Sequence, residues 1–394
     1  MKATTIWVGL DVHKETISVA VLVGDAGTPR SVVTVRNDGT ELPRLVRKLS
    51  KEGPVRACYE AGGCGYQVYR ELSELGVECD VIAPSLIPVR AGDRVKTDRR
   101  DAEKLVRLYR AGELTSIRVP TPDEEALRDL VRCREDVREE VQRHRHRLLK
   151  FLLRHGRTHD GAHWTVKHWS WLRTLRFEQP LVDRVFRDYL AALEAGITRL
   201  SGLEREIDAC AESEPYKPIV GRLRCLKGID TLSAMVLIAE ICDFDRFQRP
   251  QELMAFVGLV PREHSSGSKQ RRGSITKTGN DNARRILVEA AWHYRRPPNR
   301  SVALLARWKG QAPEVINHAF SAQTRLHNRH RRLISRGKAS QIATTAVARE
   351  LCGFIWAIAR ARHASVPECL PAASVRSQTR RSAHLPRPAR SSGS

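Results

Sequence analysis

The stretch IWVGLDVHKETISVAVLV, residues 6–23, contains two β-rich runs joined by a short polar turn. Residues 6–12 and 16–23 are rich in β-branched and other apolar side chains, which favour extended strands. A third run, SVVTVR at residues 31–36, follows after a second connection. Runs separated by such short connections predict neighbouring antiparallel strands. The chain therefore begins with the antiparallel part of a β-sheet.

Beyond these runs, the sequence predicts alternating helices and strands. We expect a helix over residues 39–51, a strand over 54–60, a helix after Gly62 and Gly63, and a strand over 77–83. Two prolines interrupt the pattern before a further helix begins near Thr97. This order predicts a mixed sheet of the ribonuclease-H type, which is an α/β fold.

Four acidic residues fall at the ends of these predicted elements. Asp11 and Glu60 each end a strand, whereas Asp98 and Asp101 lie three residues apart at the start of the helix near Thr97. Taken singly, such acids are turn formers or charges that the helix dipole stabilises. Taken together, they form a set that can bind two divalent ions roughly 4 Å apart, a site for phosphodiester chemistry. Carboxylate oxygens favour Mg²⁺ or Mn²⁺.

The net charge of +23 is concentrated at one end of the chain. Residues 262–394 carry 26 basic and 6 acidic side chains, against 42 and 39 in residues 1–261. A basic C-terminal third is typical of a surface that binds nucleic-acid phosphates. A polybasic membrane-binding segment is the alternative, but no lipidation motif or strong basic amphipathic stripe supports it.

The sequence predicts neither export nor a membrane span. The nine cysteines are scattered without zinc-ligand spacing, as expected of thiols in a reducing cytoplasm. The first predicted strand begins close to the N-terminus and leaves no room for a signal peptide. The longest apolar run, residues 351–359, is too short to cross a bilayer. We therefore expect a cytoplasmic, nucleoid-associated protein without membrane contact.

Two long amphipathic helices are predicted over residues 123–155 and 182–211, with an aromatic-rich insertion at 163–177 between them. A dimerising coiled-coil arm and a plain helical hairpin explain them equally well. Further along, the turn at residues 227–230 resembles a helix-hairpin-helix motif, whose backbone contacts phosphate. A helix-capping turn with Asp230 or Thr231 as N-cap explains it equally well.

A serine- and glycine-rich loop with basic side chains precedes a helix that begins near Asn282. Ser265, Ser266 and Ser268 lie in this loop, and a serine can attack a phosphodiester once it is positioned and activated. Most serines in such loops belong to flexible linkers. Residues 300–361 are predicted to be helical, with a basic run at 328–338. The predicted phosphate-binding residues are Lys269, Arg271, Arg272, Lys277, Arg284, Arg285, Arg329, Arg331 and Arg332.

In the order of its motifs the chain resembles the DEDD-type insertion-sequence transposases, a family related to pilin-gene invertases and guided by a bridge RNA. The resemblance covers about residues 5–361. Its first block consists of GLDVHKETISVAV with Asp11, CYEAGGCGY with Glu60, and KTDRRDA with Asp98 and Asp101. Its second block is FVGLVPREHSSGSKQRRGSITKTGNDNARRILVEAA, which contains Ser266.

The resemblance implies an α/β plus α fold in four parts. These are a RuvC-like domain at 1–120, a helical coiled-coil arm at 121–212, a C-terminal transposase domain at 213–361 and a disordered basic tail at 362–394. It also implies a composite active site for cutting and rejoining DNA. Asp11, Glu60, Asp98 and Asp101 would bind Mg²⁺, while Ser266 attacks a DNA strand and forms a covalent phosphoserine link. The neighbouring Ser265 is the other candidate nucleophile.

The family also implies the partners. These are donor and target DNA, a non-coding guide RNA, and further copies of the chain in a homodimer or homotetramer. Two other functions fit the same residues. A RuvC-like, structure-specific nuclease of the junction-resolvase type would use water as its nucleophile and form no serine adduct. A non-catalytic nucleic-acid-binding protein with a degenerate domain is disfavoured because all four acids are present.

Overall fold

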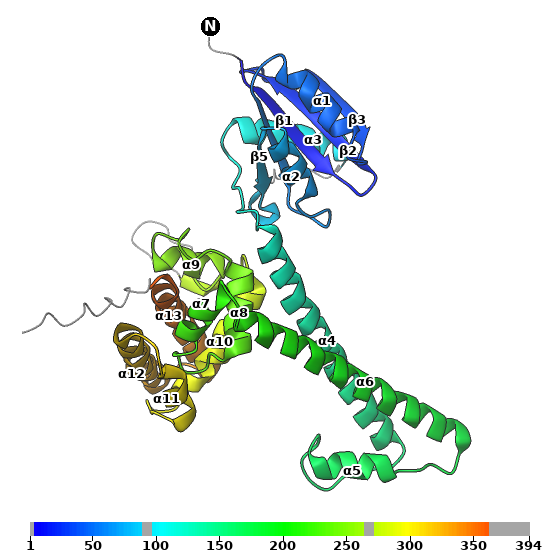
Figure 1. Cartoon of the computed structure of the whole chain (residues 1–394), viewed down its shortest axis with the longest axis vertical. Coiled ribbons are helices and arrows are strands. Elements are labelled where there is room, and N and C mark those ends of the chain that lie inside the picture. Colours follow the sequence, from blue (N-terminus) through cyan, green and yellow to red (C-terminus); the bar gives the residue numbers. More distant parts are fainter. Residues whose placement is uncertain (1–3, 89–96, 264–271, 362–394) are drawn as a thin grey trace, which may run out of the picture. The chain divides into compact units, whose positions relative to one another are not determined.

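The structure, a computed structural model, describes residues 4–88, 97–263 and 272–361 (Figure 1). The tail predicted to be disordered, residues 362–394, lies outside the described residues.

The N-terminal part contains a five-stranded mixed sheet in the order β3-β2-β1-β4-β5. β1 pairs antiparallel with β2 and parallel with β4, β2 pairs antiparallel with β3, and β4 pairs parallel with β5. The predicted mixed α/β sheet is thus confirmed. The strands are β1 (Ile6–Val12), β2 (Thr16–Val23), β3 (Ser31–Arg36), β4 (Val55–Glu60) and β5 (Glu78–Ile82).

Helices cover both faces of this sheet because its side chains alternate between two cores. On β1, Val8 and Leu10 belong to the core formed with α1 (Glu41–Ser50) and α2 (Gln67–Glu74). Trp7 of the same strand packs instead with Ala102 and Val106 of α3 (Asp98–Arg110). Successive residues of a strand point to opposite faces. α1 and α2 therefore cover one face, and α3 covers the other.

Gly9 allows α3 to lie directly against the central strand. A Cβ atom at this position would come within 2.5 Å of the Ala102 carbonyl oxygen and 2.6 Å of the Val106 nitrogen. Any other side chain would therefore push the helix away from the strand. This close approach brings the first turn of α3 to the edge of the sheet where β1 ends.

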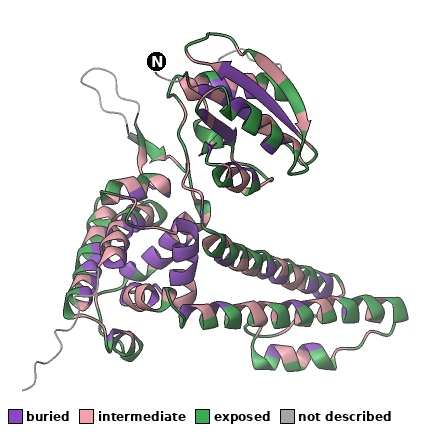
Figure 2. Cartoon of the chain, turned by 45° about the horizontal axis from the view of Figure 1, so that its top comes forward, coloured by how far each residue is buried: buried purple, intermediate pink, exposed green. Residues whose placement is uncertain are grey.

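The middle of the chain forms a helical hairpin with a short helix at its tip. Its helices are α4 (Pro122–Arg154), α5 (Val166–Thr174) and α6 (Pro180–Ala211). A capping box of Thr121 and Glu124 begins α4. α4 and α6 pack along each other around a core that includes Val141, Leu148 and Leu193, and exposed residues line their outer sides (Figure 2). This packing accords with the plain helical hairpin, and a coiled coil between two copies stays a prediction.

The C-terminal part is mainly helical and is built around the buried helix α8. Its helices are α7 (Tyr216–Leu223), α8 (Thr231–Ile241), α9 (Pro250–Phe256), α10 (Asp281–Ala291), α11 (Val302–Trp308), α12 (Pro313–Ser335) and α13 (Ser340–Arg360). Short 3-10 turns are η1 (Pro84–Leu86) in the N-terminal part and η2 (Trp292–Arg295) after α10. A two-stranded sheet of β6 (Pro261–Glu263) and β7 (Arg272–Ile275) precedes α10.

The turn before α8 acts as a helix cap. The Asp230 carboxylate accepts a hydrogen bond of 2.8 Å from the Ser233 backbone N–H, which confirms Asp230 as the N-cap. Gly228 has a φ of +87° and packs against the Ala290 carbonyl oxygen of α10. The absence of a side chain at Gly228 thus allows the turn before α8 to pack closely against α10.

Among the described residues, one helix, α13, is long and apolar enough to cross a membrane by its length and composition. It extends well beyond the apolar run of residues 351–359. Half of its most apolar window is buried inside the protein, where it packs against α9, α10 and α12. Core helices pass the same test of length and composition, so this feature is weak evidence for a membrane span.

Candidate active site

Two predicted acids lie side by side at the ends of β1 and β4. The parallel pairing places Leu10 opposite Tyr59, so Asp11 and Glu60 are the next residues on their strands. Cys58 packs with Leu105 of α3, and alternation puts Glu60 on the same face as Cys58. By the same alternation Asp11 shares the face of Trp7, which also packs with α3. Both carboxylates therefore belong to the α3 face of the sheet.

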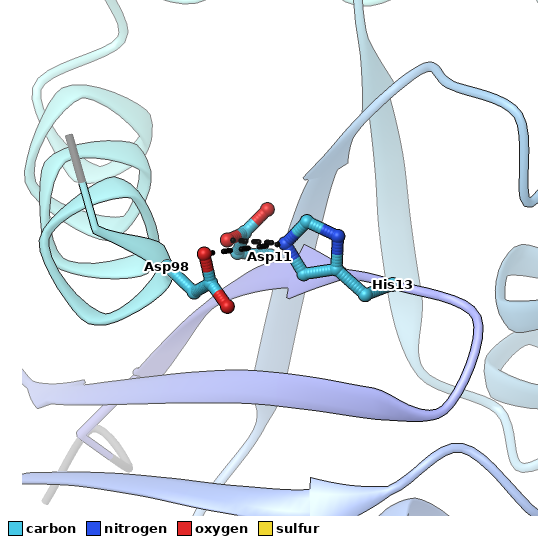
Figure 3. Close-up of side chains that lie close together, drawn as sticks. All are labelled: Asp11, His13 and Asp98. Carbon is cyan, nitrogen blue, oxygen red and sulfur yellow. Dashed lines mark hydrogen bonds and ion pairs between the residues drawn. The ribbon is translucent and has the colours of Figure 1, made fainter.

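The first turn of α3 adds the other two acids. The Thr97 hydroxyl caps the helix by accepting a hydrogen bond of 3.4 Å from the Arg100 N–H. Asp98 follows this cap, and its carboxylate points toward Asp11 and His13 (Figure 3). The His13 Nε2 atom lies 3.2 Å from an Asp11 oxygen and 3.5 Å from an Asp98 oxygen. Potential ligand atoms of these three residues all lie within 4.8 Å of one another.

The pKa of Asp11 is raised above its ordinary value. Burial of the carboxyl group is the largest cause, and the negative charges of Asp98 and Asp101 add to it. His13 acts in the opposite direction by its charge and its hydrogen bond. Asp101 is therefore close enough to influence Asp11. A divalent cation would relieve this crowding of negative charge, and the carboxylate oxygens are the donors that hard cations prefer.

His13 is a site residue that the sequence reasoning did not single out. It follows Asp11 by two positions, and residues two apart on an extended chain point to the same side. The spacing D-x-H at the end of a strand was therefore a usable signal. Among the described residues, the structure brings His13, Asp11 and Asp98 together and places Glu60 on the adjacent strand end.

The predicted serine loop connects β6 and β7. These strands pair antiparallel with Glu263 opposite Arg272, so the two ends of the loop lie beside each other. The loop residues Ser265, Ser266, Ser268, Lys269 and Arg271 lie outside the described residues. Lys277, just after β7, is exposed and has a φ of +58°.

A buried carboxylate fixes the segment that follows β7. Glu240 of α8 is 1 % exposed and accepts two hydrogen bonds of 2.9 Å from Arg132 of α4. It also accepts hydrogen bonds from Asn280 at 2.7 Å and Asn282 at 3.0 Å. The Asn280 side-chain oxygen in turn caps α10 by accepting from the Ala283 N–H. Burial alone would raise the pKa of Glu240, but these hydrogen bonds outweigh it and lower the pKa.

Several of the predicted phosphate-binding cations have partners within the protein. Arg284 donates to the Val257 carbonyl at 3.0 Å, and Arg285 pairs with Glu135 at 3.1 Å and with Glu289 at 3.0 Å. On α12, Arg329 pairs with Glu350 of α13 at 3.1 Å. The other α12 cations, Arg331 and Arg332, are exposed. Arg272 lies in β7.

Acidic residues on the α3 face of a mixed, ribonuclease-H-like sheet, joined to a basic helical part, define an enzyme that acts on nucleic-acid phosphodiesters. Comparison with known proteins gives a more specific answer. A transposase profile of the DEDD type found in IS110 matches residues 8–156, and the profile of the IS116/IS110/IS902 transposase family matches residues 220–306.

Two of the relatives match more than four fifths of the chain. A putative transposase, y4qE, of Sinorhizobium fredii is 41% identical over 360 residues, which are 90% of this chain and 88% of the relative. The transposase for insertion sequence element IS1533 of Leptospira borgpetersenii is 37% identical over 333 residues, 83% and 96% of the two chains. The chain belongs to the IS110 family of insertion-sequence transposases, and it is a DNA transposase.

Proposed function

We propose that this transposase cuts and rejoins DNA strands at a composite site, formed by a Mg²⁺-binding set of Asp11, Glu60, Asp98 and Asp101 and by the nucleophile Ser266. The observation that carries the proposal is the meeting of Asp11, His13 and Asp98 where β1 ends, with the pKa of Asp11 raised by burial and by like charges. Such crowding favours a divalent cation, and Mn²⁺ would be accepted by the same oxygens.

The acids and the serine have separate tasks. When bound, the metal ions activate an attacking oxygen and neutralise the leaving one. Asp11 and Glu60 lie on paired strands and Asp98 on a capped helix, which supports a role as ligands positioned before DNA binds. In the serine step a bond forms between the Ser266 oxygen and phosphorus, and the phosphorus–oxygen bond to one deoxyribose breaks. The serine proton is lost, and the released sugar hydroxyl gains a proton.

Rejoining reverses this exchange. A hydroxyl group of the new strand attacks the same phosphorus, displaces the serine oxygen and restores the phosphodiester. The number of phosphate ester bonds is unchanged throughout, so no external energy source is needed. The loop that contains Ser266 joins the paired strands β6 and β7, and the serine assignment rests on its place in the second motif block of the family.

The choice of DNA site is a separate part of the proposal. We propose that a non-coding guide RNA supplies sequence recognition by base pairing, while basic residues of the C-terminal part contact backbones. The exposed cations Lys277, Arg331 and Arg332 support this role. Adding RNA transcribed from the DNA that flanks the gene is expected to direct cleavage to a defined site. Cleavage at that same site without RNA would contradict it.

We further propose that two or four copies act together through the helical hairpin. Leu153, Leu181 and Val185 are exposed apolar residues near its tip. They suit a contact between hairpins. We propose the domain limits 1–120, 121–212 and 213–361, and the start of α4 after Thr121 and of α7 at Tyr216 supports them. Association with the nucleoid would follow from DNA binding.

Metal dependence tests the site directly. Strand cleavage should require Mg²⁺ or Mn²⁺, should stop when the metal is chelated, and should return when Mg²⁺ is restored. Cleavage that persists without divalent ions would contradict the metal site. A metal-dependent product with no covalent protein–DNA adduct would favour the junction-resolvase mechanism instead.

A further inference from the structure

Helix α1 presents a row of basic side chains on its outer face. Arg44, Arg47, Lys48 and Lys51 are exposed and recur at intervals of three and four residues along the helix and its C-cap. The opposite face, including Val46, packs into the core. Residues three and four apart share one side of a helix, so the four cations form one surface.

The basic surface of α1 borders a groove of about 620 Å³. α2 forms the other wall, where Glu71 and Glu74 are the acidic residues that line the groove. The described part of the chain contains no ion pair within 4.0 Å between the four α1 cations and a carboxylate. The groove therefore carries an excess of positive charge.

Other surface arginines of the same sheet domain form close ion pairs. Arg30 pairs with Glu52, Arg36 with Glu41 at 2.7 Å, and Arg56 with Glu78. Pairing of this kind neutralises a surface cation locally. The α1 cations form no such close ion pair, although Lys48 interacts with Glu52 at longer range, and a row of cations attracts a polyanion.

This surface is separate from the metal-binding acids. α1 packs on the face of the sheet that carries Val8 and Leu10, whereas Asp98 belongs to α3 on the opposite face. A phosphate bound along α1 is thus not the phosphate that reacts at Asp11. It belongs to a flanking part of the same nucleic acid or to a second segment of it.

The spacing of the row fits a nucleic-acid backbone. Arg44 and Lys51 are seven residues apart, about 10 Å along the helix axis. One DNA strand places a phosphate every ~3.4 Å along its axis, so the row can follow about three phosphates. We propose that the basic groove of α1 binds the phosphate backbone of the DNA substrate outside the reacting site. The proposal rests on the family's DNA substrate and does not depend on the nucleophile or on the guide RNA.

The salt dependence of DNA binding tests this surface. The full-length triple variant Arg44→Gln, Arg47→Gln, Lys51→Gln is compared with wild type on a random-sequence DNA duplex without divalent metal. The slope of log Kobs against log salt should become shallower by about 2 to 3, and affinity at moderate salt should fall by roughly 10- to 100-fold. The thermal midpoint should stay close to that of wild type because the substituted side chains are exposed.

A charge-matched control uses Arg30→Gln, Arg36→Gln, Arg56→Gln, which removes the same net charge from paired positions. The slope of log Kobs against log salt in this control should stay near that of wild type. Its change from wild type should be less than half of the change in the α1 variant. Equal losses in both variants would overturn the proposal, because net charge alone would then explain them. An α1 variant with unchanged DNA binding, or with weaker binding to a structured RNA only, would also overturn it.

Discussion

The carboxylate of Asp11 lies where both burial and neighbouring charges oppose its ionisation. Burial is the larger cause of its raised pKa, and Asp98 and Asp101 contribute through their charges. His13 offsets part of this effect. Carboxyl groups with a perturbed pKa are concentrated at functional sites. Asp11 is therefore a candidate for binding a cation or taking part in a reaction.

Replacing Asp11 by Asn should remove cleavage and leave DNA binding nearly unchanged. We expect cleavage to fall by at least about 100-fold, because the loss of even an outer partner of a metal ligand costs 10- to 100-fold. Single-turnover cleavage and a binding titration measure the two effects. The matched control Asp25→Asn, at an exposed turn, should cleave normally. Normal cleavage by Asp11→Asn would contradict the metal site.

The sequence singles out the four acids, whose metal-binding role stays a prediction, but it does not single out the contact of His13 with Asp11 and Asp98. Asp11 and Glu60 could be predicted because each ends an apolar run, and Asp98 and Asp101 because a helix start follows Thr97. The D-x-H spacing indicated that His13 lies near Asp11, but its contact with Asp98 depends on how the chain turns after β1 and how α3 packs on the sheet. The partners of Glu240 could not be predicted, since Arg132 lies 108 positions away and Asn280 lies 40.

The position of α3 against β1 depends on one residue without a side chain. Gly9→Ala would bring a Cβ atom within 2.5 Å of the Ala102 carbonyl oxygen. We expect α3 to shift, so that Asp98 moves away from Asp11 and cleavage falls at least tenfold, while the free energy of unfolding drops by about 1–3 kcal/mol. Chemical denaturation and a cleavage assay measure these changes. Gly27→Ala, where nothing lies within 4 Å, should change neither.

The tip of the helical hairpin should be sensitive to pH. His168 of α5 is fully buried, and its Nδ1 accepts a hydrogen bond of 3.1 Å from the Trp164 N–H. Burial, together with the nearby His163 and His159, lowers the pKa of His168 to about 4. The unfolded chain takes up a proton below pH ~6.5, whereas the folded one does not until about pH 4. The contribution of neutral His168 to the free energy of unfolding is therefore complete above pH 6.5. It is lost as the pH falls toward 4.

We expect this loss to be roughly 1–3 kcal/mol between pH 7 and pH 4. The free energy of unfolding, measured by denaturant titration at several pH values, should depend on pH more weakly in His168→Asn than in wild type. An unchanged pH dependence in that variant would contradict the role of His168.

Among the elements, long and regular ones were predicted well. β1, β2 and β3 have the predicted limits because each is a run rich in β-branched and other apolar side chains, bounded by polar connections. β6 and β7 were not predicted because three and four residues are too few to show alternation. The packing of α4 against α6 of the same chain could not be predicted from the sequence. An amphipathic helix does not specify whether its partner belongs to the same chain or to another copy.

The net charge of a long segment does not show where its basic side chains lie on the surface. Residues 1–261 are nearly neutral overall, yet the α1 cations form an unpaired row in that part. The C-terminal excess of charge is partly used within the protein, because Arg285 and Arg329 pair with Glu135 and Glu350. The surface that meets DNA therefore cannot be derived from net charge alone.

The contacts of Glu240 join three helices that lie far apart in the sequence. Glu240→Ala should lower the free energy of unfolding by about 3 kcal/mol, because it leaves Arg132, Asn280 and Asn282 without their acceptor. The control Glu350→Ala removes a more exposed acid that pairs with Arg325 and Arg329, and should lower it by less than about 1 kcal/mol. Denaturant unfolding compares the two. Equal losses would show that the buried contacts have no special weight.

Trapping the protein on DNA tests the proposed chemistry of the whole enzyme most directly. Wild type, Ser266→Ala and Ser265→Ala are each incubated with Mg²⁺ and a nicked DNA substrate that prevents rejoining, and any adduct is digested and mapped by mass spectrometry. We predict a phosphoserine link at Ser266 in wild type and in Ser265→Ala, and no adduct in Ser266→Ala. Metal-dependent cleavage by wild type without any adduct would contradict it.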